Sequence, residues 1–481
     1  MGVERLLRRW RTAYSGFLAC GGLRKARRTG FAGAALTAIA AANLVALPAH
    51  AQPSGSIPLV RDAETEGLLR DYLAPILKAA GLPGGTTEVV LINKRDFNAF
   101  VVDSRRIFIN VGVITASDTP NEVIGVLAHE TGHIAGGHLV RMRDAMAKAQ
   151  VMAAIGMILG IGAMAAGAGT GSGEMGQAGI GIAGAGMQTA HRSFLAYQRG
   201  EEESADRAAL KYLEKTKQSA RGMIRVFERF ADQQLLSARF TDPYAQSHPM
   251  PRDRIAQLED RARKSPYFDA VDPPALQARH DLVRAKLIAF TEAPAAIARR
   301  YPASDQSLAA HYARAVLAHR VRDPQSAQRQ LDALIKAQPN NAFFWELKGQ
   351  TLLESGRPKE AVAALRKAVS LAPNAPLIRT MLGDAMVASG DRKLVDEAVG
   401  QLNRGLATDT LGGVSYRQLA MAYAQRGEIG MADLATARGL MAEGNVDAAR
   451  RYAARAQTKL KPGSPAWLQA DDIVSYKPTK P

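Results

Sequence analysis

The stretch "LAHETGHIAGGH" at residues 127–138 holds three of the nine histidines in this chain of 481 residues. The segment before it, "NEVIGVL" at 121–127, predicts a helix start followed by an apolar face. On a helix with 3.6 residues per turn, His129 and His133 project from one face, roughly 40° apart. Glu130 lies beside them and can reach a water on the same metal. We therefore expect a rigid helix that presents two imidazoles to a metal ion.

The spacing of these residues indicates zinc chemistry. Two imidazoles suit Zn²⁺, which lowers the pKa of a bound water, and a nearby glutamate can then take the proton. H-E-x-x-H is the motif of zinc hydrolases. The alternative is a helix whose two histidines form only local hydrogen bonds. We predict one Zn²⁺ per chain on His129 and His133, with Glu130 as the catalytic base.

The third histidine, His138, is not expected to bind the metal. In the longer motif H-E-x-x-H-x-x-G-x-x-H, the third histidine would fall at position 139, which is Leu139. If the helix continues, His138 points about 180° away from His129. We therefore expect the third ligand to come from later in the chain, and His138→Ala to leave activity almost unaltered.

Residues 1–51 have the composition of a cleaved export signal. A long basic segment precedes the apolar run "FAGAALTAIAAANLVAL", and "AHA" at 49–51 provides small residues for cleavage before Gln52. An uncleaved anchor is the alternative. Residues 1–51 contain eight basic residues and one acid, so cleavage lowers the formal net charge from +17 to +10 and removes Cys20, the only cysteine. The remaining positive charge is spread out, which predicts no nucleic-acid partner and permits peripheral contact with an anionic membrane surface.

The patterns that follow the signal predict a mixed α and β domain that extends over 52–265. Residues 60–80 have the pattern of an amphipathic helix, and 87–114 alternate in the way of three short strands. Residues 151–173 contain no charge, and after Glu174 a second uncharged stretch extends to Ala190. We expect a helical hairpin at 151–190 that caps the active site, either buried in protein or dipping into a membrane surface. A true membrane span is the alternative.

The C-terminal part, 306–475, predicts tetratricopeptide repeats after a linker at 266–305. Pro339 and Pro373 are 34 residues apart, which is the period of such repeats. Between them, large and small residues alternate in the way that lets two antiparallel helices pack, as Gly349 and Leu365 do. About four repeats would form a solenoid with a concave groove. An ordinary helical bundle is the alternative.

Candidates for the third ligand lie in "RGEEESADRAALKYL" at 199–213, which predicts another helix. Glu201, Glu202 and Glu203 are adjacent, and helical geometry lets only one of them point inward. Asp206 follows Glu202 by four residues and shares its face.

These motifs resemble those of the membrane-associated gluzincins, which include the HtpX-type proteases and the CAAX prenyl proteases. Their E-x-x-A-D motif is matched by residues 202–206, and an N-A-F stretch on the substrate-facing strand is matched by Asn98, Ala99 and Phe100. The resemblance implies Glu202 as the third ligand and Asp206 as a supporting acid near the scissile bond.

The arrangement is most similar to a periplasmic branch of that family with C-terminal repeats. It implies an α+β zincin-type (gluzincin) protease domain followed by an all-α tetratricopeptide-repeat solenoid. In that branch a histidine in an S/T-H-P element, matched by His248, lies on a loop over the active site and can occupy the fourth zinc position. A loop histidine with only a local hydrogen bond is the alternative.

The expected function is that of an exported zinc metalloendopeptidase for envelope quality control. The branch degrades misfolded or stalled outer-membrane β-barrel proteins and aids their assembly, and its repeat groove is the candidate docking surface for the β-barrel assembly machinery. The alternative is a chaperone-like adaptor with latent proteolysis. An extended substrate would add as a strand beside 98–101.

Overall fold

A computed structural model of the chain describes residues 58–170, 173–236, 248, 252–408 and 413–477. Pro58–Pro481 form one compact unit. The predicted export signal at 1–51 lies outside the described residues.

A small sheet follows the first helix, α3 (Ala63–Ala80). Its strands are β1 (Glu88–Ile92), β2 (Ala99–Asp103) and β3 (Arg106–Asn110), in the order β1-β3-β2. β1 is parallel to β3, whereas β2 is antiparallel to it. The N–H of Arg105 donates to the side chain of Asp103 and tightens the short turn between β2 and β3. Because β3 lies between the other two strands, β2 is at an edge of the sheet.

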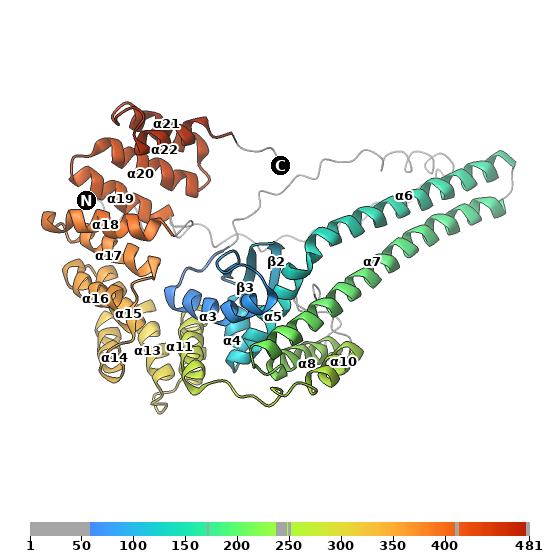
Figure 1. Ribbon diagram of the computed structural model, residues 1–481, viewed down its shortest axis with the longest axis horizontal. Helices are drawn as coiled ribbons and strands as arrows, with labels where there is room; N and C mark the ends of the chain where they lie inside the picture. Colours follow the sequence, from blue (N-terminus) through green and yellow to red (C-terminus); the bar gives the residue numbers. More distant parts are fainter. Residues whose placement is uncertain (1–57, 171–172, 237–247, 249–251, 409–412, 478–481) are drawn as a thin grey trace, which may run out of the picture. The chain divides into compact units, whose positions relative to one another are not determined.

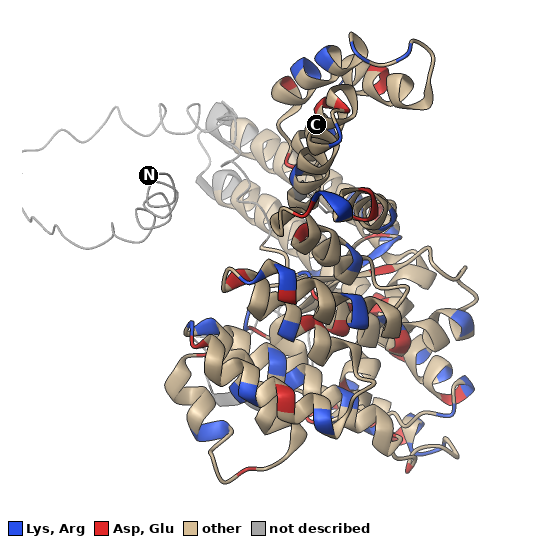
Figure 2. Ribbon diagram, turned by 90° about the vertical axis from the view of Figure 1, so that its left-hand side faces the viewer, with Lys and Arg blue, Asp and Glu red and all other residues tan. Residues whose placement is uncertain are grey.

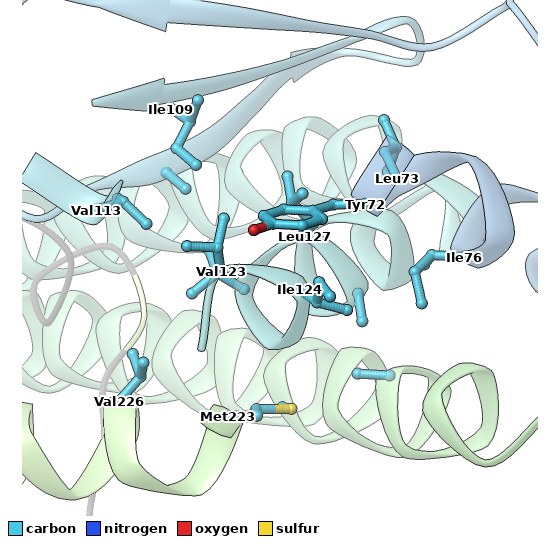
Figure 3. Packing of buried hydrophobic residues seen from close by; sticks show 14 of the residues in the cluster. Tyr72, Leu73, Ile76, Ile109, Val113, Val123, Ile124, Leu127, Met223 and Val226 are labelled. Atoms are coloured by element: carbon cyan, nitrogen blue, oxygen red, sulfur yellow. The ribbon is translucent and has the colours of Figure 1, made fainter. Parts of the chain in front are cut away.

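The core of the N-terminal domain forms where this sheet and α3 meet two further helices. α4 (Val111–Ala116) leads into α5 (Pro120–Gly136), and α8 (Arg221–Leu236) packs on the opposite side of α5. Figure 3 shows the interleaved side chains of this core, to which each of these helices and β3 contributes. An added Cβ at Gly125 would lie 2.7 Å from the Cβ of Met223, so α5 and α8 pack almost backbone to backbone. The helix that carries H-E-x-x-H is thereby held from several sides.

Two long helices form an antiparallel hairpin, α6 (His138–Thr170) and α7 (Gly173–Lys215), which run side by side in Figure 1. Over His138–Ala165, α6 is long and apolar enough to cross a membrane by length and composition, with a mean hydropathy of 1.5. The C-terminal part of α7 packs against α5. The hairpin expected at 151–190 thus belongs to helices that reach the active site at their other end.

The stretch expected to be a linker, 266–305, instead contains two helices, α11 (Pro274–Thr291) and α12 (Pro294–Arg300). Leu282 and Ile288 of α11 are buried in one cluster with Tyr312 of the first repeat helix. On its other side, α11 contacts α3, α4 and α5. Pro274 and Pro294 of this stretch begin helices, where a missing N–H costs nothing, rather than breaking the chain into a flexible segment.

Paired helices follow from residue 308 to residue 475. In chain order they are α13 (Leu308–Arg320), α14 (Pro324–Ala337), α15 (Ala342–Glu354), α16 (Pro358–Leu371), α17 (Pro376–Ala388), α18 (Val395–Leu406), α19 (Gly413–Gln425), α20 (Ile429–Ala442), α21 (Val446–Gln457) and α22 (Pro465–Ser475). A Cβ added at Gly349 would collide with the side chain of Leu365, and one at Gly383 with Leu402. These are the small and large positions that the sequence pairs within a repeat. A short helix, α10 (Arg252–Ala262), precedes α11 in the protease domain.

Charge is mixed over the repeat helices. Figure 2 shows Lys and Arg residues interspersed with Asp and Glu residues there. Ion pairs such as Arg366 with Glu397 link neighbouring helices at the surface.

Candidate metal centre and active site

Two helices carry the side chains of the predicted site. α5 presents His129, Glu130 and His133, and α7 presents Glu202 and Asp206. The helices approach closely at Gly132, where an added Cβ would lie 2.8 Å from the carbonyl oxygen of Ala205. A larger residue would push the helices apart, so this glycine lets the acids of α7 reach the histidines of α5.

Four side chains converge at one point. His129, His133, Glu202 and His248 each offer one donor atom, and these atoms all lie within 4.8 Å of one another. Nε2 of His129 lies 3.1 Å from Nε2 of His133 and 3.3 Å from Oε2 of Glu202. The other oxygen of Glu202 lies 3.5 Å from Nε2 of His133.

These distances fit a tetrahedral metal ion. Ligand atoms about 2.1 Å from a zinc ion are about 3.4 Å apart from each other in a tetrahedron. Without a cation, two imidazole nitrogens would face each other beside a buried carboxylate. The donor set of two imidazoles and one carboxylate suits zinc, and the spacing leaves room for the ion between them.

The electrostatics of the cluster favour an ionised carboxylate. Burial raises the pKa of Glu202, but His248 and His129 outweigh burial and hold the pKa well below its usual value. Burial lowers the pKa of His129, but Asp206 and Glu202 outweigh it and raise the pKa to about 9. Burial, together with the neighbouring His129, holds the pKa of His133 well below its usual value. An ionised Glu202 is the form that a metal cation needs.

Only one of the three adjacent glutamates reaches the cluster. Glu202 is 7% exposed and lies at the histidines. Glu201 instead forms ion pairs with Arg141 and His138, at 2.6 and 2.9 Å. Glu203 is exposed and lies 3.7 Å from Arg207.

Asp206 lies behind the cluster, on the outer side of the His129 ring. Its Oδ1 is 3.0 Å from Nδ1 of His129, while both of its oxygens accept hydrogen bonds from Arg254 of α10, at 2.6 and 2.9 Å. The same guanidinium lies 3.1 Å from Oε2 of Glu202. Arg254 thus links the two acids. No motif in the sequence pointed to this link.

Glu130 is fully buried beside the cluster. Both of its carboxylate oxygens lack a hydrogen-bond partner among the described residues, although Nε2 of His248 lies 3.4 Å from one of them. Burial raises the pKa of Glu130. A carboxylate with a raised pKa is better suited to take and return a proton near neutral pH.

The expectation for His138 is wrong in its geometry, although His138 does stay outside the cluster of four. α5 ends at Gly137, whose φ of 64° reverses the chain, so the helix does not continue through His138. The ring therefore folds back, and its Nδ1 lies 2.9 Å from Nδ1 of His133. Gly136 leaves the space that this ring fills, because a Cβ there would collide with it. The pair of glycines before His138 was the sequence signal for this turn.

His248 lies inside the site rather than beside it. It is 6% exposed, and its Nδ1 lies 3.0 Å from Oε2 of Glu202 and 3.3 Å from Nε2 of His129. Ser247 and Pro249, the neighbours that complete its motif, lie outside the described residues.

The predicted substrate strand lies beside the metal helix. Asn98 directly precedes β2, and Ala99 and Phe100 belong to it; β2 packs against α5. Phe100 stacks on Phe108 of β3 with ring centroids 5.5 Å apart, and Oδ1 of Asn98 is buried without a hydrogen-bond partner among the described residues. A buried acceptor next to an edge strand could accept a hydrogen bond from a bound peptide.

Known proteins match the chain in the same two parts, a domain that contains the metal cluster and a region of paired helices. Residues 63–262 match the family described as Peptidase family M48, and residues 312–376 match a tetratricopeptide repeat. The chain is 26% identical to the Beta-barrel assembly-enhancing protease of Escherichia coli (strain K12), over 86% of this chain and 83% of that protein. It is 29% identical to the Putative beta-barrel assembly-enhancing protease of Vibrio cholerae serotype O1, over 53% of this chain and 51% of that protein.

The predicted fold class, an α+β protease domain followed by a helical repeat solenoid, is confirmed by these matches together with the helices and sheet described above. The first part contains the cluster of candidate metal ligands, and the second part contains the paired helices. The chain is a metalloprotease with a peptidase family M48 domain and C-terminal tetratricopeptide repeats.

Proposed function

We propose that the chain is a zinc metalloendopeptidase in which His129, His133 and Glu202 hold one Zn²⁺. A bound zinc ion would lower the pKa of a water and polarise a peptide carbonyl. Glu130 accepts the proton of the attacking water and returns it to the leaving amine, a role that its raised pKa supports. The observation that carries the proposal is the convergence of three ligand atoms at tetrahedral spacing next to a buried carboxylate that has no hydrogen-bond partner among the described residues.

Asp206 is better suited to positioning than to direct contact with substrate. Its oxygens are engaged by Arg254 and by the outer nitrogen of His129. A carboxylate on that nitrogen fixes the orientation of the ring and raises its strength as a ligand. We therefore assign Asp206 to the support of His129.

The substrate is proposed to be an unfolded or stalled β-barrel protein of the outer membrane, cleaved in the periplasm after export. The relatives named as β-barrel assembly-enhancing proteases support this class of substrate. A β-barrel precursor exposes strands whose backbone groups are unpaired, and such a strand can pair with the edge strand β2 at Asn98, Ala99 and Phe100. A folded barrel offers no such strand, so the geometry itself selects for folding state.

The repeats are proposed to dock a partner, with the β-barrel assembly machinery as the candidate. A cavity of about 490 Å³ lies where α11 and the repeat helices α15 and α17 meet residues 59–63 of the N-terminal domain, and Phe290, Gln350 and Met381 are among the residues that line it. A mixed apolar and polar cavity of this size can take side chains of an extended segment.

A second function is favoured by His248, which offers a fourth donor atom beside those of His129, His133 and Glu202. An imidazole there competes with water for the metal, and the protease would then rest in a latent state. In that state the chain would act as a chaperone-like adaptor until a substrate or partner favours the open form. The alternative is that His248 forms only a structural hydrogen bond with Glu202.

The test uses residues 52–481 and an outer-membrane β-barrel protein offered either unfolded or folded in detergent. We expect cleavage of the unfolded form only. Glu130→Gln should retain zinc and lose activity by several orders of magnitude, whereas Glu202→Gln should lose zinc as well; Glu203→Gln on the exposed face of the same helix is the control. Full cleavage by Glu130→Gln would refute the mechanism. If Glu130→Gln still speeds barrel folding, the adaptor function is independent of proteolysis.

A further inference from the structure

The outer part of the α6–α7 hairpin has its large apolar side chains on the outside. Ile155, Ile158 and Ile161 of α6 are 52%, 69% and 57% exposed, and Ile180 of α7 is 65% exposed. Other exposed apolar residues of the same region are Val151, Met152, Met157, Leu159, Ile182 and Met187. In a water-soluble helical hairpin, residues of this kind would face the other helix.

Glycines occupy the seam between the two helices instead. A Cβ added at Gly156 would lie 2.8 Å from the Cα of Gly186, and one at Gly179 would lie 2.5 Å from the carbonyl oxygen of Gly160. At 100° per residue, the exposed apolar residues of α6 cover about 220° around the axis, and Gly156 and Gly160 fall in the remaining arc. Small residues inside and large apolar residues outside form the arrangement of helices that pack in lipid.

The length and the boundary of this region agree with a bilayer. Between Lys148 and Arg192 the sequence contains a single charged residue, Glu174, which lies close to the turn of the hairpin. From Lys148 to the turn is about 22 residues, or roughly 33 Å of helix, against about 30 Å for a hydrocarbon core. Arg143, Lys148, Arg192 and Arg199 mark the end of the apolar region that is nearer the protease core.

We propose that the hairpin inserts its apolar part into a bilayer that contains anionic lipid, with the basic residues at the headgroups. A protein partner would cover only one side of α6, whereas a bilayer surrounds the helix. Only a surrounding apolar medium covers an exposed apolar arc of about 220°. The basic residues complement anionic headgroups. Insertion would hold the metal site, which shares α7 with the hairpin, at the membrane surface.

The proposal is tested by flotation of residues 52–481 with vesicles of phosphatidylethanolamine and phosphatidylglycerol. Residues 1–51 are left out because their own apolar run would bind lipid, and Pro58–Pro481 form a compact unit without them. We expect the protein to float at low and at high salt. Since an aspartate near the bilayer centre is strongly disfavoured, the double variant Ile158→Asp with Ile180→Asp should bind at least about 100-fold more weakly.

Two controls separate insertion from other kinds of binding. Val271→Asp places the same charge at a residue that is 90% exposed outside the hairpin, and it should not change flotation. Because residues 52–481 contain no cysteine, Ile158→Cys can carry a single environment-sensitive dye, whose emission should shift to the blue with vesicles and be quenched by bromine on the lipid chains. The proposal is overturned if the protein does not float, if the aspartate variant floats as well as the parent, or if the aspartates abolish only self-association.

Discussion

His138→Ala should weaken zinc binding although His138 does not reach the cluster of ligand atoms. The spacing of the histidines predicts that His138→Ala leaves activity almost unaltered, but the contact between His138 and His133 changes that expectation. Nδ1 of His138 lies 2.9 Å from Nδ1 of His133, so the two rings share a hydrogen bond on the side away from the cluster. The other nitrogen of His138 lies 2.9 Å from Oε2 of Glu201, which is paired in turn with Arg141. The series fixes the orientation of the His133 ring.

The magnitude follows from what the substitution removes. His138 is 4% exposed, so its loss leaves Nδ1 of His133 without its partner in a place that water reaches poorly. An unpaired buried donor costs roughly 1–3 kcal/mol. Loss of a hydrogen-bond partner behind a metal-bound histidine typically weakens metal binding about 10- to 100-fold. The two figures agree, since each factor of ten in affinity corresponds to about 1.4 kcal/mol.

The assay is competition for zinc between residues 52–481 and a fluorescent chelator of known affinity. We expect His138→Ala to bind zinc about 10- to 100-fold more weakly and Glu201→Gln to show a smaller loss. His138→Gln should recover part of the loss because its amide oxygen can still accept a hydrogen bond from Nδ1–H of His133. His191→Ala, an exposed histidine on the same hairpin, is the control. The thermal stability of the metal-free protein should change less than that of the zinc-bound protein. A zinc affinity of His138→Ala within twofold of the parent would refute the reasoning.

Two further predictions concern latency and pH. His248→Ala should raise basal cleavage of an unfolded outer-membrane protein about 10-fold or more without changing zinc content. The substitution removes contacts of 3.0 and 3.3 Å with Glu202 and His129, and each such contact contributes about 1 kcal/mol or more when one partner is charged. A time course that shows equal or slower cleavage would leave His248 as a structural residue. Burial raises the pKa of Glu346 to about 8, and the nearby Lys286 only partly opposes it. The folded state therefore keeps a proton that the unfolded state loses above its pKa of about 4.5, and stability falls as pH rises from there towards about 8. Glu346→Gln should reduce that fall in urea unfolding at pH 6 and pH 8, and an unchanged slope would contradict it.

The sequence alone predicted the fold class and the helix α5 that places His129 and His133 on one face. The four-residue spacing of His129 and His133 dictates a shared helical face wherever the helix lies, because the period of the helix is local. The 34-residue repeat likewise predicts paired helices, since each repeat is a local unit that packs on its neighbour. The fold class could therefore be predicted before any tertiary contact was known.

The choice among Glu201, Glu202 and Glu203 needed either a resemblance or the structure. Periodicity says that one of three adjacent residues faces inward, but which one depends on how α7 is rotated against α5, and packing at Gly132 and Ala205 sets that rotation.

Tertiary structure alone decided the positions of Arg254 and the residues of α11, whereas His138 was placed by a local turn that the spacing argument overlooked. A left-handed Gly137 turned His138 back onto His133, which a continuing helix would have prevented. Arg254 joins Asp206 across 48 residues of sequence, and α11 packs on both the protease core and the first repeat where a linker was expected. Contacts between residues far apart in the chain depend on where whole elements pack, and local spacing carries no information about that.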